Sequence, residues 1–120
     1  MVIALWIVAG IAALANIASG SMKLLSYDNY AKNAPYTQDF SPAFIRTVGA
    51  LEVLGGIGLI LPQLTGILPW LTIVAGFGLA IIQAGAIVIH TRRKEYKSLP
   101  VNVVLLVLPL FVALGWLFWA

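Results

Sequence analysis

The chain has 120 residues, of which 62% are hydrophobic and only 9% charged. Soluble domains carry about 25% charged residues, so an ordinary water-soluble globular protein is excluded. There is no cysteine, which excludes disulfides, thiolate metal sites and thiol redox chemistry by this chain. The formal net charge is +3, but the basic residues flank apolar segments. They therefore predict membrane topology and no nucleic-acid partner.

Four apolar segments predict an all-α polytopic membrane protein, a four-transmembrane-helix bundle that forms a single domain over residues 1–120. The helices are expected at about 2–24, 44–61, 67–90 and 101–119, each near the length of about 20 residues that a bilayer core requires. Pro69 falls in the first turn of the third helix, where its missing N–H matters least. Pro109 predicts a kink in the fourth. The first segment is too long for the apolar part of a signal peptide, so we expect it to be retained.

All seven basic residues lie in or beside the first and third connections. The positive-inside rule therefore predicts an integral protein of a bacterial inner (cell) membrane, with loops 23–43 and 90–100 in the cytoplasm and both termini outside. The first connection is rich in Tyr, Asn and Pro, and we expect a partly ordered cap with Tyr27, Tyr30 and Tyr36 at headgroup level.

Polar residues inside the spans predict a pocket in the cytoplasmic half of the bundle. Glu52 is a carboxylate in a hydrophobic span, which is costly without a partner. Lys23 has the flexible stem that suits it to this pairing. Along their helices, Glu52 lies roughly 12 Å and Gln83 roughly 10 Å from the charged-loop side, and Asn16 has a similar depth. The residues expected in this polar, ligand-binding pocket are Asn16, Lys23, Arg46, Glu52, Gln83, His90 and Asn102.

The same cluster also permits a purely structural interpretation. Small residues let helices approach closely in lipid, and Asn or Gln side chains bond across the contact. One histidine without cysteine supplies neither bis-histidine haem ligation nor an all-protein zinc site, so neither haem nor a protein-ligated metal is expected. No nucleophile or metal constellation is recognisable, so no catalytic residue is assigned and intrinsic catalysis by this chain alone is not expected. The glycines expected at helix contacts are Gly20, Gly49, Gly55, Gly56 and Gly76.

An ordered set of motifs resembles the DoxX-like family of small four-helix integral membrane proteins. The set begins with Gly20-x-x-Lys23 and continues with Arg46-x-x-Gly49-x-x-Glu52-x-x-Gly55, followed by Leu59. Ala86 and His90 come near the end of the third span, and Pro100-x-Asn102 opens the fourth. The resemblance covers essentially the whole chain.

The resemblance implies a helical membrane domain that works with other membrane or redox proteins. Relatives have been linked to quinol oxidation and to oxidative-stress complexes. We therefore expect an accessory or binding subunit for respiratory, quinone-linked or membrane-protein partners, with a quinone, a lipid or another hydrophobic small molecule as ligand and a protein partner or homo-oligomer in the bilayer.

A small proton-coupled transporter of hydrophobic compounds is the alternative function. Such a protein would also have four spans and a membrane glutamate. Transporters of this kind favour an acid early in the chain and a weak topology bias, and this sequence has neither.

Overall fold

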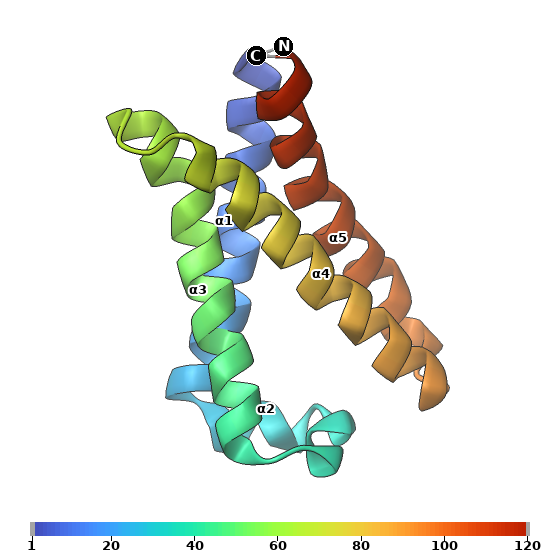
Figure 1. The fold of residues 1–120 in the computed structure, drawn as a ribbon. Coiled ribbons are helices and arrows are strands. Elements are labelled where there is room, and N and C mark those ends of the chain that lie inside the picture. Colours follow the sequence, from blue (N-terminus) through green and yellow to red (C-terminus); the bar gives the residue numbers. More distant parts are fainter. Residues whose placement is uncertain (1, 120) are drawn as a thin grey trace.

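The computed structural model describes residues 2–119, and over this range the chain is all-α (Figure 1). Its long helices are α1 (Val2–Leu25), α3 (Pro42–Thr65), α4 (Trp70–Arg92) and α5 (Leu99–Leu114), and a π-helical turn η3 (Gly115–Trp119) continues α5. Three shorter elements lie in the connections: α2 (Tyr27–Lys32), η1 (Pro35–Asp39) and η2 (Tyr96–Ser98). Four segments are long and apolar enough to cross a membrane, namely α1, α3, α4 and Tyr96–Trp119. The predicted four-helix membrane bundle is confirmed.

The second long helix extends beyond its expected range of 44–61 at both ends. At its start, the Ser41 hydroxyl accepts a hydrogen bond from the Phe44 N–H at 3.1 Å and caps the helix. At its end, α3 runs through Pro62 for one more turn and closes at Gly66, whose φ is 72°. The third helix begins at Trp70, directly after Pro69, and the fourth begins at Leu99 and runs through Pro109.

The four helices form two pairs, with α1 against α3 and α4 against α5 (Figure 1). The pairs meet near the end that carries both termini and splay apart toward the other end. The segment that contains α2 and η1 lies across this open end. There, an ion pair between Arg93 and Asp39 at 2.6 Å joins the first and third connections.

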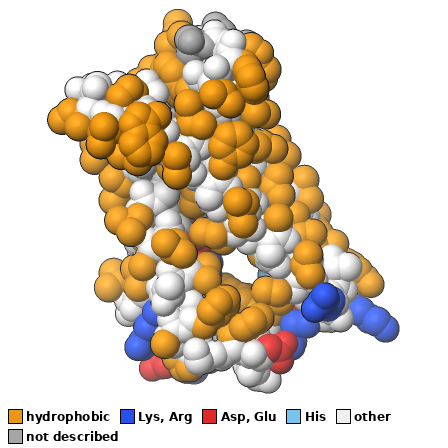
Figure 2. Space-filling view, viewed as in Figure 1, with side chains coloured by type: hydrophobic (Ala, Val, Ile, Leu, Met, Phe, Trp, Pro, Cys, Tyr) orange, Lys and Arg blue, Asp and Glu red, His pale blue; other side chains and the backbone are white. Residues whose placement is uncertain are grey.

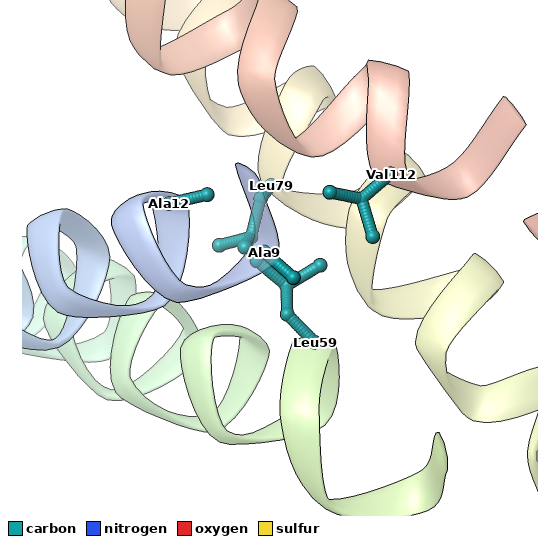
Figure 3. Packing of buried hydrophobic residues seen from close by; sticks show 5 residues of the cluster. All are labelled: Ala9, Ala12, Leu59, Leu79 and Val112. Carbon is teal, nitrogen blue, oxygen red and sulfur yellow. The ribbon is translucent and has the colours of Figure 1, made fainter. Parts of the chain in front are cut away.

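The apolar core sits where the two pairs meet. It is built from small and aliphatic side chains of all four helices, and Ala9, Ala12, Leu59, Leu79 and Val112 converge there (Figure 3). Small residues allow the backbones to come close, which is the main source of helix packing in lipid.

Each of the five glycines expected at helix contacts faces a neighbouring helix. A Cβ at Gly49 would lie 2.8 Å from the Gly20 carbonyl oxygen, and one at Gly20 would meet the Gly49 carbonyl oxygen. A Cβ at Gly76 would lie 2.6 Å from the carbonyl oxygen of Pro109. Gly55 and Gly56 make room for the side chains of Leu79 and Ile17. The absence of a side chain at these positions therefore sets the distances between the helices.

The outer surface suits a bilayer. Large apolar side chains such as Ile3, Leu14, Leu54 and Ile81 are exposed along the helices. Figure 2 shows apolar side chains over most of this face, while Lys, Arg, Asp and Glu gather at the splayed end. An apolar belt with charges confined to one end indicates an integral membrane protein.

Candidate functional site

A cavity of about 380 Å³ lies between the two helix pairs at the charged-loop end. Figure 2 shows a hollow between the lower halves of α3 and α4, the two helices that supply most of its wall. Its volume falls within the range of about 300–1,000 Å³ that is usual for small-molecule sites. Most lining residues are apolar, and the polar ones are Ser19, Lys23, Tyr30, Tyr36, Gln83, His90 and Asn102.

A buried ion pair between Lys23 and Glu52 supports one side of the cavity. The Lys23 ammonium binds Glu52 Oε1 and also donates to Ser19 Oγ at 3.0 Å. The same ammonium lies 5.4 Å from the centroid of the Tyr30 ring. Glu52 is completely buried and Lys23 nearly so, which means that each supplies the countercharge the other needs in a low-dielectric interior. The expected partner of Glu52 is thus present.

The glycine contact between α1 and α3 makes this ion pair possible. Lys23 Cβ lies only 2.7 Å from the position that a Cβ of Gly49 would take. A side chain at Gly49 would therefore push the base of Lys23 away from α3. Gly49 and Glu52 are three residues apart and share a face of α3, so the contact places Lys23 directly beside the carboxylate.

Two buried side-chain amides at the cavity wall each have one atom that finds no partner within residues 2–119. Gln83 on α4 is 4% exposed and Asn102 on α5 is 8% exposed. Within residues 2–119, Gln83 Oε1 and Asn102 Nδ2 make no hydrogen bond. Leaving a buried polar group unsatisfied costs about 1–3 kcal/mol, so these atoms are places where a ligand or a water would be stabilised.

A cluster from the connections closes the loop end of the cavity. The hydroxyl groups of Tyr30 and Tyr36 are hydrogen-bonded to each other, and burial raises the pKa of both above its usual value of 10. The Tyr36 ring packs edge-on against His90, with 5.2 Å between the ring centroids. His90 Nδ1 bonds Glu95 at 2.8 Å, and this bond, together with Arg93, lowers the pKa of the Glu95 carboxyl.

The structure brings most of the expected pocket residues together. Lys23, Gln83, His90 and Asn102 line the cavity, and Glu52 lies behind Lys23. Asn16 is buried but lies outside the lining, with its amide N–H donating to the Ala12 carbonyl at 2.8 Å.

Arg46 is the expected pocket residue that the structure separates from the others. Its side chain is exposed, and its guanidinium lies 5.2 Å from the centroid of the Tyr27 ring. The physical reason is helical geometry, because six residues separate Arg46 from Glu52 and turn it about 120° away from the Glu52 face.

Sequence reasoning missed three of the polar lining residues. Ser19 lies one helical turn before Lys23, so the helix period was a signal that could have identified it. Tyr30 and Tyr36, which were expected at headgroup level, also line the cavity. No local pattern could place them there, because their positions depend on how the first connection folds against α4.

Four spans, an intramembrane ion pair and a polar cavity at one end define a small helical integral membrane protein with a candidate binding site. A family model described as the DoxX-like family matches residues 7–112, and the chain belongs to this family. The chain matches no curated protein and no solved structure.

Proposed function

We propose that the chain is a binding or accessory subunit that holds a small hydrophobic molecule in the cavity at its charged-loop end. The observation that carries this proposal is that Gln83 Oε1 and Asn102 Nδ2, which have no partner within the described residues 2–119, belong to side chains at the wall of a cavity of about 380 Å³. Such a cavity, mostly apolar with a few convergent polar groups, is typical of a ligand site.

The chemistry of the lining favours a quinone or a lipid-like ligand. Carbonyl and hydroxyl groups on a ligand would match the donors and acceptors of the two amides. The basic lining residues already have protein partners, since Lys23 pairs with Glu52 and His90 Nδ1 bonds Glu95. A redox or respiratory membrane protein that delivers or uses such a molecule is the partner that we propose.

The distribution of charge supports an orientation for this subunit. The basic residues of the chain lie in or beside the two connections at the splayed end. We place this end, and with it the cavity, on the cytoplasmic side of a bacterial inner membrane. The transporter alternative gains no support from the Glu52 carboxylate, because that group is already engaged by Lys23.

The binding proposal can be tested with variants that remove the amides. The chain would be purified into lipid nanodiscs, and co-purifying lipids and quinones would be identified by native mass spectrometry. Gln83→Leu and Asn102→Leu should each lose the bound species, since one hydrogen bond is worth about tenfold in affinity. Thr72→Val is the matched control, because Thr72 Oγ1 is also buried and unpartnered within residues 2–119 but lies outside the cavity lining.

A bound species that is retained in both amide variants would refute the binding site. The accessory role is tested separately, by complementation of a deletion strain under oxidative or respiratory stress. Gln83→Leu should fail to complement at normal membrane abundance, whereas Thr72→Val should complement. Full complementation by Gln83→Leu would refute a role of the cavity in the cell.

A further inference from the structure

A second hollow lies next to the cavity, along the contact between α3 and α4. It has a volume of about 410 Å³, and its lining is almost entirely apolar. Its wall on α4 extends from Leu71 to Ile82, a distance of roughly 16 Å along the helix. Ile82 lines both hollows, so the apolar groove adjoins the polar cavity.

Missing side chains keep this groove open. Gly55, Gly58 and Gly78 all belong to its wall. A Cβ at Gly78 would meet nothing within 4 Å, so helix packing does not require a glycine there. Gly55, by contrast, makes room for Leu79. The space beside Gly78 is therefore free volume on the membrane-facing side of the bundle.

The rim of the cavity is also open to the membrane. Phe44 on α3 and Ile81 and Gly85 on α4 line the cavity and are exposed. The hollow in Figure 2 lies between these two helices. A molecule dissolved in the bilayer can therefore reach the amides sideways, without passing through the charged connections.

We infer that the two hollows form one site for a membrane-dissolved amphiphile, with its uncharged polar head at Gln83 and Asn102 and its hydrocarbon chain in the groove along Gly78. This inference rests on the proposed binding function and adds where the head and the hydrocarbon chain of the ligand lie. The buried amides account for a polar head on the ligand, because Asn102 Nδ2 is a donor and Gln83 Oε1 an acceptor. The adjoining groove explains the chain, since aliphatic walls bury hydrocarbon favourably where helix packing is loose.

The decisive experiment tests the binding of the ligand's head and of its hydrocarbon chain separately. Binding to the full-length protein in nanodiscs would be measured for a decyl-substituted benzohydroquinone, kept reduced, and for the same ring without its alkyl chain. The hydroxyls of this ring can donate to Gln83 Oε1 and accept from Asn102 Nδ2. Gly78→Leu should lower the affinity for the decyl compound at least tenfold and leave the affinity for the ring without its alkyl chain unchanged. Gly10→Leu is the matched control, because a Cβ at Gly10 also meets nothing within 4 Å and Gly10 lines neither hollow. It should change neither affinity.

Two further arms define the head. Dioctanoylglycerol replaces the hydroquinone ring by a glyceride with one free hydroxyl and shows which neutral head the cavity prefers. Binding of either neutral probe that is lost in Gly78→Leu supports the inference. Dioctanoyl phosphatidic acid carries an anionic head. If it binds as tightly as the neutral probes, the inference that the ligand's head is uncharged is refuted. Val74→Phe fills the same groove from its exposed rim and replaces Gly78→Leu if that variant does not fold.

Failure of the inference and failure of the proposed function give different results. Suppose that Gln83→Leu weakens binding of the decyl compound but Gly78→Leu and Val74→Phe do not. The ligand's hydrocarbon chain then lies elsewhere, and only the groove's part in the site is refuted. If Gln83→Leu changes the affinity of no probe, the amides are not a binding site. The proposed function then fails, and the inference fails with it.

Discussion

At the scale of single residues, the pair of Lys23 and Glu52 is the most demanding feature of the bundle. Both groups are buried, and Glu52 Oε2 has no partner within residues 2–119. Each charge is stable in this position because the other is present. Removing one partner of a buried pair usually costs about 3–5 kcal/mol, whereas replacing both can be neutral.

This asymmetry gives a prediction for a double-mutant cycle. Lys23→Met and Glu52→Gln should each lower the free energy of unfolding, and Lys23→Met should do so by about 3–5 kcal/mol because it leaves an unpaired carboxylate. The free energy of unfolding of the double variant should fall by less than the sum of the two single losses. Reversible unfolding in detergent or bicelles measures all four proteins. Strictly additive losses would show that the pair contributes no coupling energy.

Glu95 gives a second prediction, on pH. Its folded-state pKa lies below the usual value of 4.5, first because of the bond from His90 and then because of Arg93. The stability from this group is therefore complete above pH 4.5 and is lost as the pH falls through the lower folded pKa.

Hydrogen exchange of residues 93–98 measures this loss. Exchange should accelerate below pH 4.5 in the native chain, relative to the intrinsic rate. Glu95→Gln should show a flatter pH profile. If exchange depends on pH equally in both proteins, the bonds of Glu95 to His90 and Arg93 are not what stabilises the third connection.

At the scale of helices, glycines decide which faces can touch. Gly76 faces backbone, since its missing Cβ would lie 2.6 Å from the Pro109 carbonyl oxygen of α5. A backbone atom cannot rotate away as the end of a side chain can. The pair of α4 and α5 is therefore expected to be sensitive to even one added methyl group.

Gly76→Ala should accordingly destabilise the bundle by about 1–3 kcal/mol, the usual cost of overpacking. Gly10→Ala is its control and should be neutral or stabilising, because alanine favours a helix by up to about 1 kcal/mol and the site is open. Thermal or denaturant unfolding in the same detergent compares the two variants. A Gly76→Ala protein as stable as the Gly10→Ala protein would contradict the close backbone contact between α4 and α5.

At the scale of the whole molecule, the two helix pairs are joined at the end near both termini and separated at the charged end (Figure 1). The cavity results from this separation and lies among the connections that carry the basic residues. The orientation in the membrane therefore decides which compartment the loops around the cavity face.

Because the chain contains no cysteine, single cysteines can report this orientation directly. Asn33 in the first connection and Thr65 at the end of α3 are both exposed and lie toward opposite ends of the bundle. With intact cells and a membrane-impermeant thiol reagent, Thr65→Cys should be labelled and Asn33→Cys should not. Lysed cells, in which both should react, are the control. Labelling of Asn33→Cys alone in intact cells would reverse the proposed topology.

The sequence predicts the spans well, because hydropathy and length alone determine which segments can cross a bilayer. Lys23 and Glu52 were also predictable, since a buried carboxylate requires a countercharge at a matching depth. The helix ends are predicted less accurately, because the apolar pattern stops before Pro62 whereas α3 passes through it. The cavity wall at Tyr30 and Tyr36 and the exclusion of Arg46 depend on the loop fold and on helix rotation, which periodicity fixes only roughly.

The close approach of Gly20 and Gly49 has a consequence for genetics. Gly49 lies outside the cavity lining, yet a side chain there would displace Lys23, whose ammonium is part of the lining. In a screen for loss of function, Gly49 and Lys23 alleles should therefore fall into one phenotypic class. Second-site suppressors of Gly49 alleles should arise at positions that widen the contact between α1 and α3. At the contact between α1 and α3, a single substitution would therefore disturb both the helix packing and the cavity lining.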